Sequence, residues 1–465
     1  KGQQSGGEES TLAEIQGSHD GSSDDEKGDL IFKTNDGSNG ASPTERLRID
    51  SNGSIVPSTL GTSNVKFGLN AGNNIASGGN YNTVIGEEAG NDITTGDNNT
   101  LIGTFSGDAI TTSGSNTAVG SYTMTSMTDG ANNVAVGTSA LDVDTKGSHT
   151  TAIGRNALGS QNFTSATDTH NTAVGNNAGQ SVTTGTNNTI VGSNAAYALT
   201  TSNSNTAIGK GALSTETSSN GNTAVGEQAL GSQNVGGSGD ARNTAVGLLA
   251  GGSITTGEKN TLVGALCADG MTTNTEMTAI GYNLAATSQT GRAREILIGS
   301  NGTGGGSNTA RFCTSVGILT IDIDGSDTSW AAASDLRLKK DVADSTVGLA
   351  FIKDLRPVTF KWNAKNAIEN SLPQYDADSS DPVFGEGKAH HGFIAQEIKT
   401  VIDAHSDVVN GHNIWKEDPD GTQQVAPSAL VPMLVKAVQE LSAKVDTLQT
   451  ENTAIKSRLD ALEAE

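Results

Sequence analysis

The sequence predicts a mainly β protein: a trimeric parallel β-roll, or solenoid, of about 17-residue coils, followed by a small α+β domain that ends in a trimeric coiled coil. Three observations predict this fold. A motif ending in Gly recurs mostly every 17 residues, the composition changes abruptly after residue 333, and apolar residues follow heptads from residue 431 onward. The expected parts are a small β module or shaft entry (1–60), the solenoid (61–300), a β linker (301–333) and a second domain (334–465, divided into an α+β part at 334–428 and the coiled coil at 429–465).

Composition limits the classes of protein that the chain can belong to. With 28 Lys+Arg against 51 Asp+Glu, the net charge of −23 argues against nucleic acid and anionic membranes as partners. Aromatic residues make up only 4%, too few for the cores of an enzyme of this length. No apolar run approaches the length of a membrane span, so we expect no membrane insertion. The chain begins at Lys1 rather than Met, which indicates a fragment or a processed chain.

The two cysteines do not form a disulfide framework or a metal motif. Cys267 and Cys313 lack CxxC or CxxH spacing, so we expect them to be buried small residues. The repeats carry no catalytic motif, and their acidic residues are scattered at turns. We therefore expect no metal and no cofactor.

The repeat region predicts a solenoid through its spacing. Nine of the thirteen intervals between the motif glycines are 17 residues, and the two of 21 indicate four-residue insertions in a loop. The glycines are Gly68, Gly86, Gly103, Gly120, Gly137, Gly154, Gly175, Gly192, Gly209, Gly226, Gly247, Gly264, Gly281 and Gly299.

Residues around each glycine indicate how the coils pack. The residue before Gly is Val or Ile in all copies except Phe67, which favours a strand, and the residue before that is mostly apolar and points to the opposite face. Both faces are thus expected to be buried, one inside the coil and one against another copy of the chain. Asn stands four residues before Gly in eleven of fourteen copies and should form ladders between coils. Ala often follows three residues after Gly as a second packing position.

Strands are also expected outside the repeats. Residues 30–33 (LIFK) and 46–50 (RLRID) are candidate strands separated by turns rich in Gly, Asn and Ser, and residues 318–322 form a further candidate strand.

The C-terminal segment predicts a coiled coil. Apolar residues alternate at steps of three and four, and one polar Asn fills a core position, where it can fix the register. The alternative is a single amphipathic helix packed on its own domain. The expected trimer core consists of Val431, Leu434, Val438, Leu441, Val445, Leu448, Asn452, Ile455, Leu459 and Leu462.

Four blocks after residue 333 resemble a known family. They are residues 334–342 (SDLRLKKDV), 351–362 (FIKDLRPVTFKW) and 391–397 (HGFIAQE), and then Leu430 onward into the coiled coil. In this order they resemble the C-terminal intramolecular chaperone domain of endosialidase-type phage tailspikes. The resemblance implies a trimerisation chaperone that assembles the upstream β structure and then cuts itself off.

The same resemblance implies the cleavage site and its residues. The cut would fall between Ala333 and Ser334, with the Ser334 hydroxyl as nucleophile and Lys339 as base. Lys339 would have to be neutral, through desolvation or nearby cations such as Arg337 or Lys340. His391, Gln396 and Glu397 match a further block, either as a supporting catalytic shell or as structural hydrogen-bonding groups.

The repeats carry a second resemblance. Asn-Thr-Ala-Val/Ile-Gly copies, such as residues 116–120 and 171–175, are similar to the head repeats of trimeric autotransporter adhesins, although the period of 17 is longer than their usual coil. This likeness implies a parallel β-roll of three chains side by side.

Together these features lead us to expect a homotrimeric phage tail fibre or appendage that contacts a host-surface receptor, a glycan or a surface protein, and joins other virion proteins. It would be extracellular, as part of the virion, and at most a single-turnover Ser-Lys peptidase acting on itself. A bacterial trimeric surface adhesin is the first alternative, but the chain lacks an aromatic terminus. A tailspike polysaccharide depolymerase is the second, and the few aromatics in the repeats argue against it.

Overall fold

The computed structural model describes residues 2–3, 9–10, 13–19, 28–35, 42–51, 53, 55–57, 61–237, 239–285, 294–315, 317–323, 331–332, 336–372, 374–384, 387–409, 412–418 and 421–464. The chain divides into two compact units, Lys1–Ala333 and Ser334–Glu465.

The first residues form antiparallel β structure. β1 (Gly2–Gln3) pairs with β2 (Glu9–Ser10), and a four-stranded sheet has the order β3-β4-β5-β6. Its strands are β3 (Ala13–His19), β4 (Gly28–Thr34), β5 (Thr44–Ile49) and β6 (Ile55–Pro57). The expected strands at 30–33 and 46–50 therefore form. Ile31 is buried in this sheet, and the carboxylate of Asp29 accepts hydrogen bonds from Arg48 and from the N–H of Ser51.

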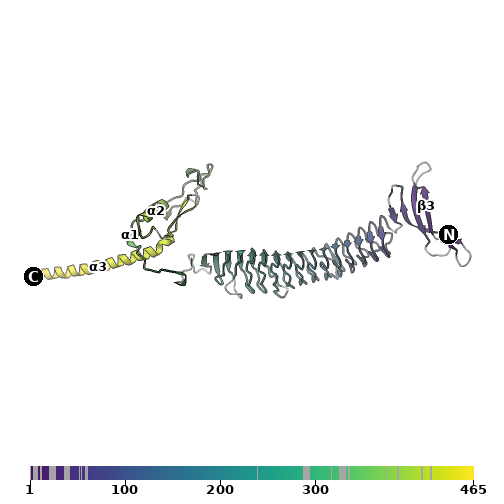
Figure 1. Ribbon diagram of the computed structural model, residues 1–465, viewed down its shortest axis with the longest axis horizontal. Helices are drawn as coiled ribbons and strands as arrows, with labels where there is room; N and C mark the ends of the chain where they lie inside the picture. The colour runs from purple at the N-terminus through teal and green to yellow at the C-terminus, as the bar shows by residue number, and fades with distance from the viewer. Residues whose placement is uncertain are drawn as a thin grey trace. The chain divides into compact units, whose positions relative to one another are not determined.

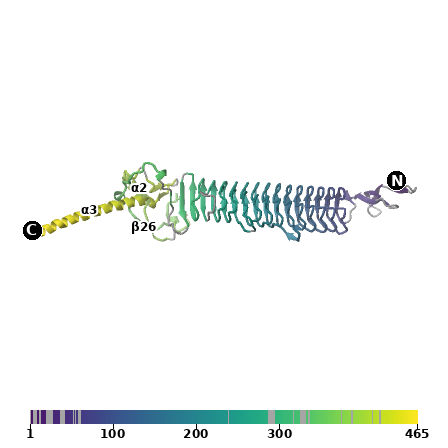
Figure 2. The same cartoon turned by 90° about the horizontal axis from the view of Figure 1, so that it is seen from below.

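A β-solenoid of fourteen coils follows and confirms the predicted fold class (Figures 1 and 2). Each coil contributes a short strand that pairs in parallel with the strand of the next coil, and most pairs are offset by 17 residues, as in Ala118 opposite Leu101. The strands are β7 (Val65–Phe67), β8 (Thr83–Ile85), β9 (Thr100–Ile102), β10 (Thr117–Val119), β11 (Val134–Val136), β13 (Thr151–Ile153), β15 (Thr172–Val174), β16 (Thr189–Val191), β17 (Thr206–Ile208), β18 (Thr223–Val225), β19 (Thr244–Val246), β20 (Thr261–Val263), β21 (Thr278–Tyr282) and β22 (Ile296–Ser300).

Three further strands close the first unit. β23 (Thr309–Thr314) continues the parallel sheet, and then β24 (Gly317–Asp322) and β25 (Ala331–Ala332) turn antiparallel. The expected strand at 318–322 lies within β24. Cys267 and Cys313 are both unbridged and buried, as predicted.

The interior of the solenoid is a single narrow core. The residue two before each motif glycine is fully buried from Val84 onward, as with Leu101 and Ala118, and the Ala three after the glycine packs beside it. Leu or Ile side chains such as Ile93 and Leu158 fill the rest of the core. Small residues dominate because the coil is too narrow for aromatic rings, which accounts for the low aromatic content.

The expected asparagine ladder forms inside the solenoid. Oδ1 of Asn116 accepts a hydrogen bond from the backbone N–H of Asn133 at 3.1 Å, and its Nδ2 donates to the carbonyl of Gly130 at 2.9 Å. Each amide thus satisfies two buried backbone groups of the following coil. The same pair of bonds recurs at Asn64, Asn82, Asn99, Asn133, Asn171, Asn188, Asn205, Asn243 and Asn260.

Each motif glycine is required by backbone geometry. All fourteen have φ between +127° and +140°, a region that side chains disfavour. A Cβ atom on Gly120 would lie 2.7 Å from the carbonyl carbon and oxygen of Gly137 in the next coil. Only glycine lets adjacent coils approach this closely. This requirement explains why glycine recurs at a position that the sequence pattern alone showed only as the end of each repeat.

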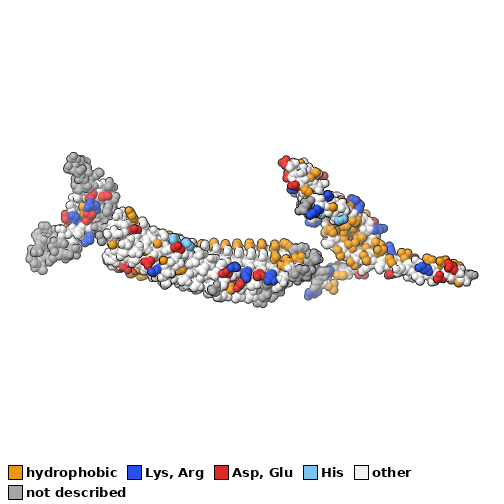
Figure 3. Space-filling view, turned by 180° about the vertical axis from the view of Figure 1, so that it is seen from behind, with side chains coloured by type: hydrophobic (Ala, Val, Ile, Leu, Met, Phe, Trp, Pro, Cys, Tyr) orange, Lys and Arg blue, Asp and Glu red, His pale blue; other side chains and the backbone are white. Residues whose placement is uncertain are grey.

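The outer face of the strands is open in the single chain. The residue before each motif glycine was expected to be buried against another copy of the chain, and this cover stays a prediction. None of these side chains is buried in the single chain, and Ile153, Ile208, Val246 and Val263 are exposed. The reason is geometric: one coil has one interior, so alternate strand residues must point out of it. The result is a row of Val and Ile side chains along the solenoid, which we call the outer row, and Figure 3 shows hydrophobic side chains lined up along one edge.

The coil before each 21-residue coil contains a buried acid where the sequence suggested only turn residues. Asp144 accepts a hydrogen bond from Gln161 at 2.6 Å, and Gln161 accepts one from Asn171 at 2.9 Å. Glu216, Gln233 and Asn243 repeat this chain of contacts, with both distances at 2.9 Å. In each case the Gln amide connects the buried acid of the coil before the insertion to the ladder Asn that follows the insertion.

The second unit is a small α+β domain that ends in a long helix. Phe351, Ile398 and Ile402 lie in its core, to which α2 (Ala395–Ala404) and the start of α3 (Val431–Glu463) contribute. Two antiparallel strand pairs flank α2 in sequence: β26 (Val358–Phe360) with β27 (His390–Gly392), and β28 (Trp415–Glu417) with β29 (Gln423–Val425). The elements are η1 (Leu336–Leu338), α1 (Leu349–Ile352), β26 (Val358–Phe360), η2 (Lys365–Ala367), β27 (His390–Gly392), α2 (Ala395–Ala404), β28 (Trp415–Glu417), β29 (Gln423–Val425), η3 (Pro427–Leu430) and α3 (Val431–Glu463).

Candidate functional site

The two residues of the predicted cleavage junction are not among the described residues. Ala333 and Ser334 lie outside the described residues, so the structure gives no distance between the Ser334 hydroxyl and Lys339. Lys339 follows η1 directly, and its backbone N–H donates to the carbonyl of Leu336 at 3.0 Å. The short 3-10 turn thus fixes the start of the segment that carries the predicted base.

The side chain of Lys339 lies at the surface of the single chain. Arg337 and Lys340, the cations next to it in sequence, are exposed as well, and Lys340 lies 3.9 Å from the carboxylate of Asp341. A lysine acts as a base in its neutral form, which burial favours. The described single chain does not supply that burial, so a working dyad would need another surface to cover this segment.

The three residues of the supporting block lie on β27 and at the start of α2. Glu397 forms a two-pronged ion pair with Arg356, with Nε to Oε2 at 2.9 Å, and this hydrogen bonding lowers the pKa of Glu397 below its ordinary value. His391 Nδ1 lies 3.3 Å from the hydroxyl of Thr359, its partner across the antiparallel pair of β26 and β27. The ion pair between Glu397 and Arg356 thus ties α2 to the segment after α1.

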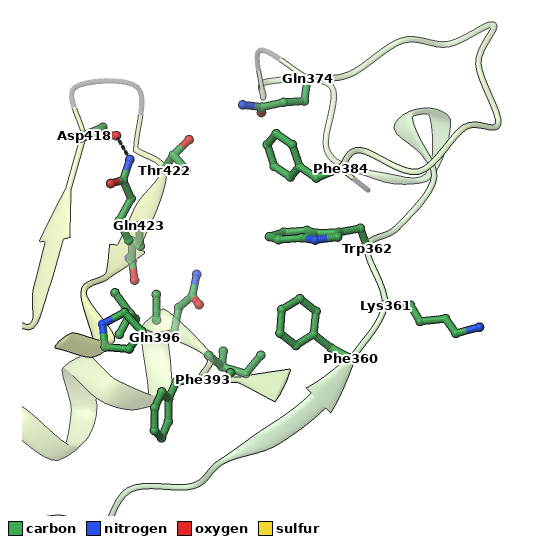
Figure 4. A pocket seen from close by; sticks show the side chains of 16 residues that line it. Phe360, Lys361, Trp362, Gln374, Phe384, Phe393, Gln396, Asp418, Thr422 and Gln423 are labelled. Carbon is green, nitrogen blue, oxygen red and sulfur yellow. Dashed lines mark hydrogen bonds between the residues drawn. The ribbon is translucent and has the colours of Figure 1, made fainter. Parts of the chain in front are cut away.

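Gln396, the third of these residues, lines a pocket of about 730 Å³ (Figure 4). One wall consists of Phe360, Trp362 and Phe384, which we call the aromatic wall. The ring centroids of Phe360 and Trp362 are 5.2 Å apart, those of Trp362 and Phe384 are 4.9 Å apart, and both contacts are edge-to-face. The facing side, which we call the polar wall, includes Gln396, Asp418, Thr422, Gln423 and Gln424.

The sequence did not predict the aromatic wall as a site. Phe360 and Trp362 lie in the block 351–362, which resembles the chaperone family, and their spacing of two places both side chains on one side of an extended chain. Phe384 joins them from 22 residues further along, a contact that no local pattern signals.

The predicted trimer core lies along one side of α3 and is uncovered in the single chain. The nine apolar side chains of this seam are each between 43% and 70% exposed, and Asn452 is exposed too. The first turns of the helix also pack on their own unit through Leu430 and Ala437, and Glu440 accepts a hydrogen bond from the N–H of Leu349 at 2.8 Å. The remaining length of the helix carries an apolar stripe that faces no part of its own unit.

Comparison with known proteins identifies the second unit. Residues 334–407 match the family described as the chaperone of endosialidase. The chain thus carries a C-terminal chaperone-of-endosialidase domain after a β-solenoid, an intramolecular chaperone of the kind typical of phage tail fibres and tailspikes. A search of curated proteins and a search of solved structures gave no significant match.

Two searches of the described residues bear on ligands and membranes. No group of three or more His, Cys, Asp or Glu side chains in those residues is arranged to hold a metal ion. No helix among them combines the length and the apolar character needed to cross a bilayer.

Proposed function

We propose that this chain is a homotrimeric phage tail fibre or appendage that binds a host-cell surface, and that its C-terminal domain is a trimerisation chaperone that cleaves itself off between Ala333 and Ser334. The observation that carries the proposal is the family match, which begins at Ser334 and is followed by the exposed heptad seam of α3. The partners would be two further copies, other virion proteins and a receptor on the host surface.

The outer row of the solenoid, in the first unit, also supports a trimer. A single chain leaves the Val and Ile side chains of the outer row partly or fully exposed, and burying apolar surface contributes about 25 cal/mol per Å². Three chains side by side would cover the row. Such contacts form only when the chains are in register, so a trimer nucleated by α3 would lower the barrier to folding.

The proposed cleavage is a peptide hydrolysis through an ester. The Ser334 hydroxyl attacks the Ala333 carbonyl while Lys339 takes the hydroxyl proton, and the scissile C–N bond breaks as the Ser334 amine is protonated. Water then hydrolyses the ester to leave a carboxylate on Ala333 and the free hydroxyl on Ser334. Because Lys339 is exposed in the single chain, trimer assembly would supply its cover, so that only assembled chains are cut.

The direct test is the intact denatured mass of freshly expressed protein. Wild type should give fragments 1–333 and 334–465, whereas Ser334→Ala and Lys339→Met should stay whole. Lys353→Met, at another exposed lysine of the same unit, is the matched control that should still be cut. If wild type stays whole as a trimer, the domain is a permanent clamp and the self-cleavage proposal is wrong.

A further inference from the structure

We infer that the pocket of the C-terminal unit bounded by the aromatic wall is occupied by a neighbouring copy of this chain in the assembled trimer. The inference rests on the proposed trimer and adds a second contact between copies, separate from the seam of α3. Three features of the pocket carry it: its uncovered apolar wall, its lack of charge, and its direct connection to the seam.

The aromatic wall is uncovered in the single chain. Trp362 is 40% exposed and Phe384 is 49% exposed, although both belong to one cluster with Phe360. Figure 4 shows Trp362 edge-on between the two phenylalanine rings, one on each side of the indole. The two rings hinder stacking of a flat ligand such as a sugar ring on the indole, and the surface left open suits the irregular apolar side chains of another protein.

The pocket carries almost no charge. Lys361 and Asp418 are the only ionisable residues among the sixteen that line it, and Figure 4 shows the Lys361 side chain pointing away from the gap. An anionic glycan or a phosphate would find no cluster of cations here. The amides of the facing wall, with Gln396 and Gln424 among them, offer donors and acceptors that suit a peptide surface.

The side of the pocket formed by β29 and η3 continues directly into the coiled-coil seam. Val425 and Pro427 line the pocket, Leu430 is buried in the core of the unit, and Val431 is the first residue of the seam. Because η3 and α3 are continuous, the pocket and the seam are held in a fixed relation. Helices in a coiled coil pack about 8–10 Å apart, so a neighbouring copy begins within about one helix width of this wall.

The test is site-specific photo-cross-linking in the full chain carrying Ser334→Ala, which retains the unit. The photoreactive residue p-benzoylphenylalanine replaces Phe384 in one variant and Val409 in a control, an exposed apolar position of the same unit outside the pocket. Light scattering first establishes the number of copies. After irradiation, the variant at 384 should give covalent dimers and trimers in several-fold excess over the control, with cross-linked peptides from two chains.

Each outcome decides a different claim. A trimer that gives only cross-links within one chain, or equal yields at both positions, overturns the inference and leaves the proposed trimer standing. A chain that scatters as a monomer overturns the proposed function itself. The same replacement at Trp362 repeats the test if the first variant does not fold, as judged by circular dichroism.

Discussion

Single buried asparagines hold consecutive coils of the solenoid in register. Asn116 is fully buried, and each of its amide atoms pairs with a backbone group of the following coil. A shorter polar residue could not reach both groups, and an apolar one would satisfy neither. The recurrence of Asn four residues before Gly, visible in the sequence, is thus explained by a hydrogen-bonding need rather than by turn preference alone.

Asn116→Ala should therefore destabilise the solenoid. The change leaves the N–H of Asn133 and the carbonyl of Gly130 buried without their partner, at a cost of about 2–4 kcal/mol for the two groups. Thermal unfolding followed by circular dichroism measures the loss. Asn176→Ala, at an exposed coil position, is the control and should leave the midpoint unchanged. An equal midpoint for both variants would show that the ladder does not stabilise the fold.

Asp108 makes stability depend on pH. Burial raises the pKa of Asp108 to about 6 from an ordinary 3.8, against backbone hydrogen bonds that lower it, and nearby Asp92 and Asp142 raise it further. The folded chain thus holds this proton more tightly than the unfolded chain does. The tighter proton binding adds to the free energy of unfolding below about pH 4, and this gain is lost as the pH rises through about 6.

Asp108→Asn should accordingly raise the unfolding midpoint at pH 7 and have little effect at pH 4. Asn has nearly the same shape as Asp but carries no charge, so the variant removes the cost of ionising a partly buried carboxyl. Thermal unfolding of wild type and variant at the two pH values measures the difference. The same gain at both pH values would mean that ionisation of Asp108 is not the cause.

At the scale of the coil, the motif glycine allows adjacent coils to stack closely. Gly120→Ala should cost about 3 kcal/mol or more, because a Cβ at φ +140° meets backbone atoms of Gly137 at 2.7 Å. Gly239→Ala is the matched control, since a Cβ there has no atom within 4 Å. Soluble yield and the unfolding midpoint are the readouts. Equal behaviour of the two variants would show that adjacent coils can move apart to admit a methyl group.

The repeat pattern predicted the coils and their register because a period of 17 residues places identical residues above one another. It also indicated two apolar faces on each strand, of which one forms the interior of the coil and the other, the outer row, is open in the single chain. The buried pairs Asp144–Gln161 and Glu216–Gln233 were missed. Each pair depends on a contact between two coils at an insertion. The sequence around Asp144 or Glu216 does not distinguish a buried acid from an acid in a solvated turn.

The seam of α3 should determine assembly. Leu448→Asp places a charge in the middle of the predicted trimer core, where it would have to be buried, so trimers should dissociate and self-cleavage should fall with them. Gln449→Asp puts the same residue on an adjacent, non-seam position and should leave assembly intact. Light scattering of both variants measures the difference. A Leu448→Asp variant that remains trimeric would show that the copies associate elsewhere.

At the scale of the whole molecule, both units present apolar surface that a single copy cannot cover. The outer row belongs to the solenoid, and the seam and the aromatic wall belong to the C-terminal unit. Sequence blocks were sufficient to find the chaperone domain, because several of them occur in the order that its family shows. They could not predict the aromatic wall, whose third ring comes from a distant loop, nor the surface that would cover Lys339.

The measurement that tests the central claim most directly is the native mass of the uncut Ser334→Ala chain in solution. The account predicts an assembly of three times the 47.2 kDa of one chain, because only association covers the outer row and the seam. A mass of one chain would contradict it, since the row and the seam would then face water, and neither assembly-coupled cleavage nor a three-chain fibre could follow.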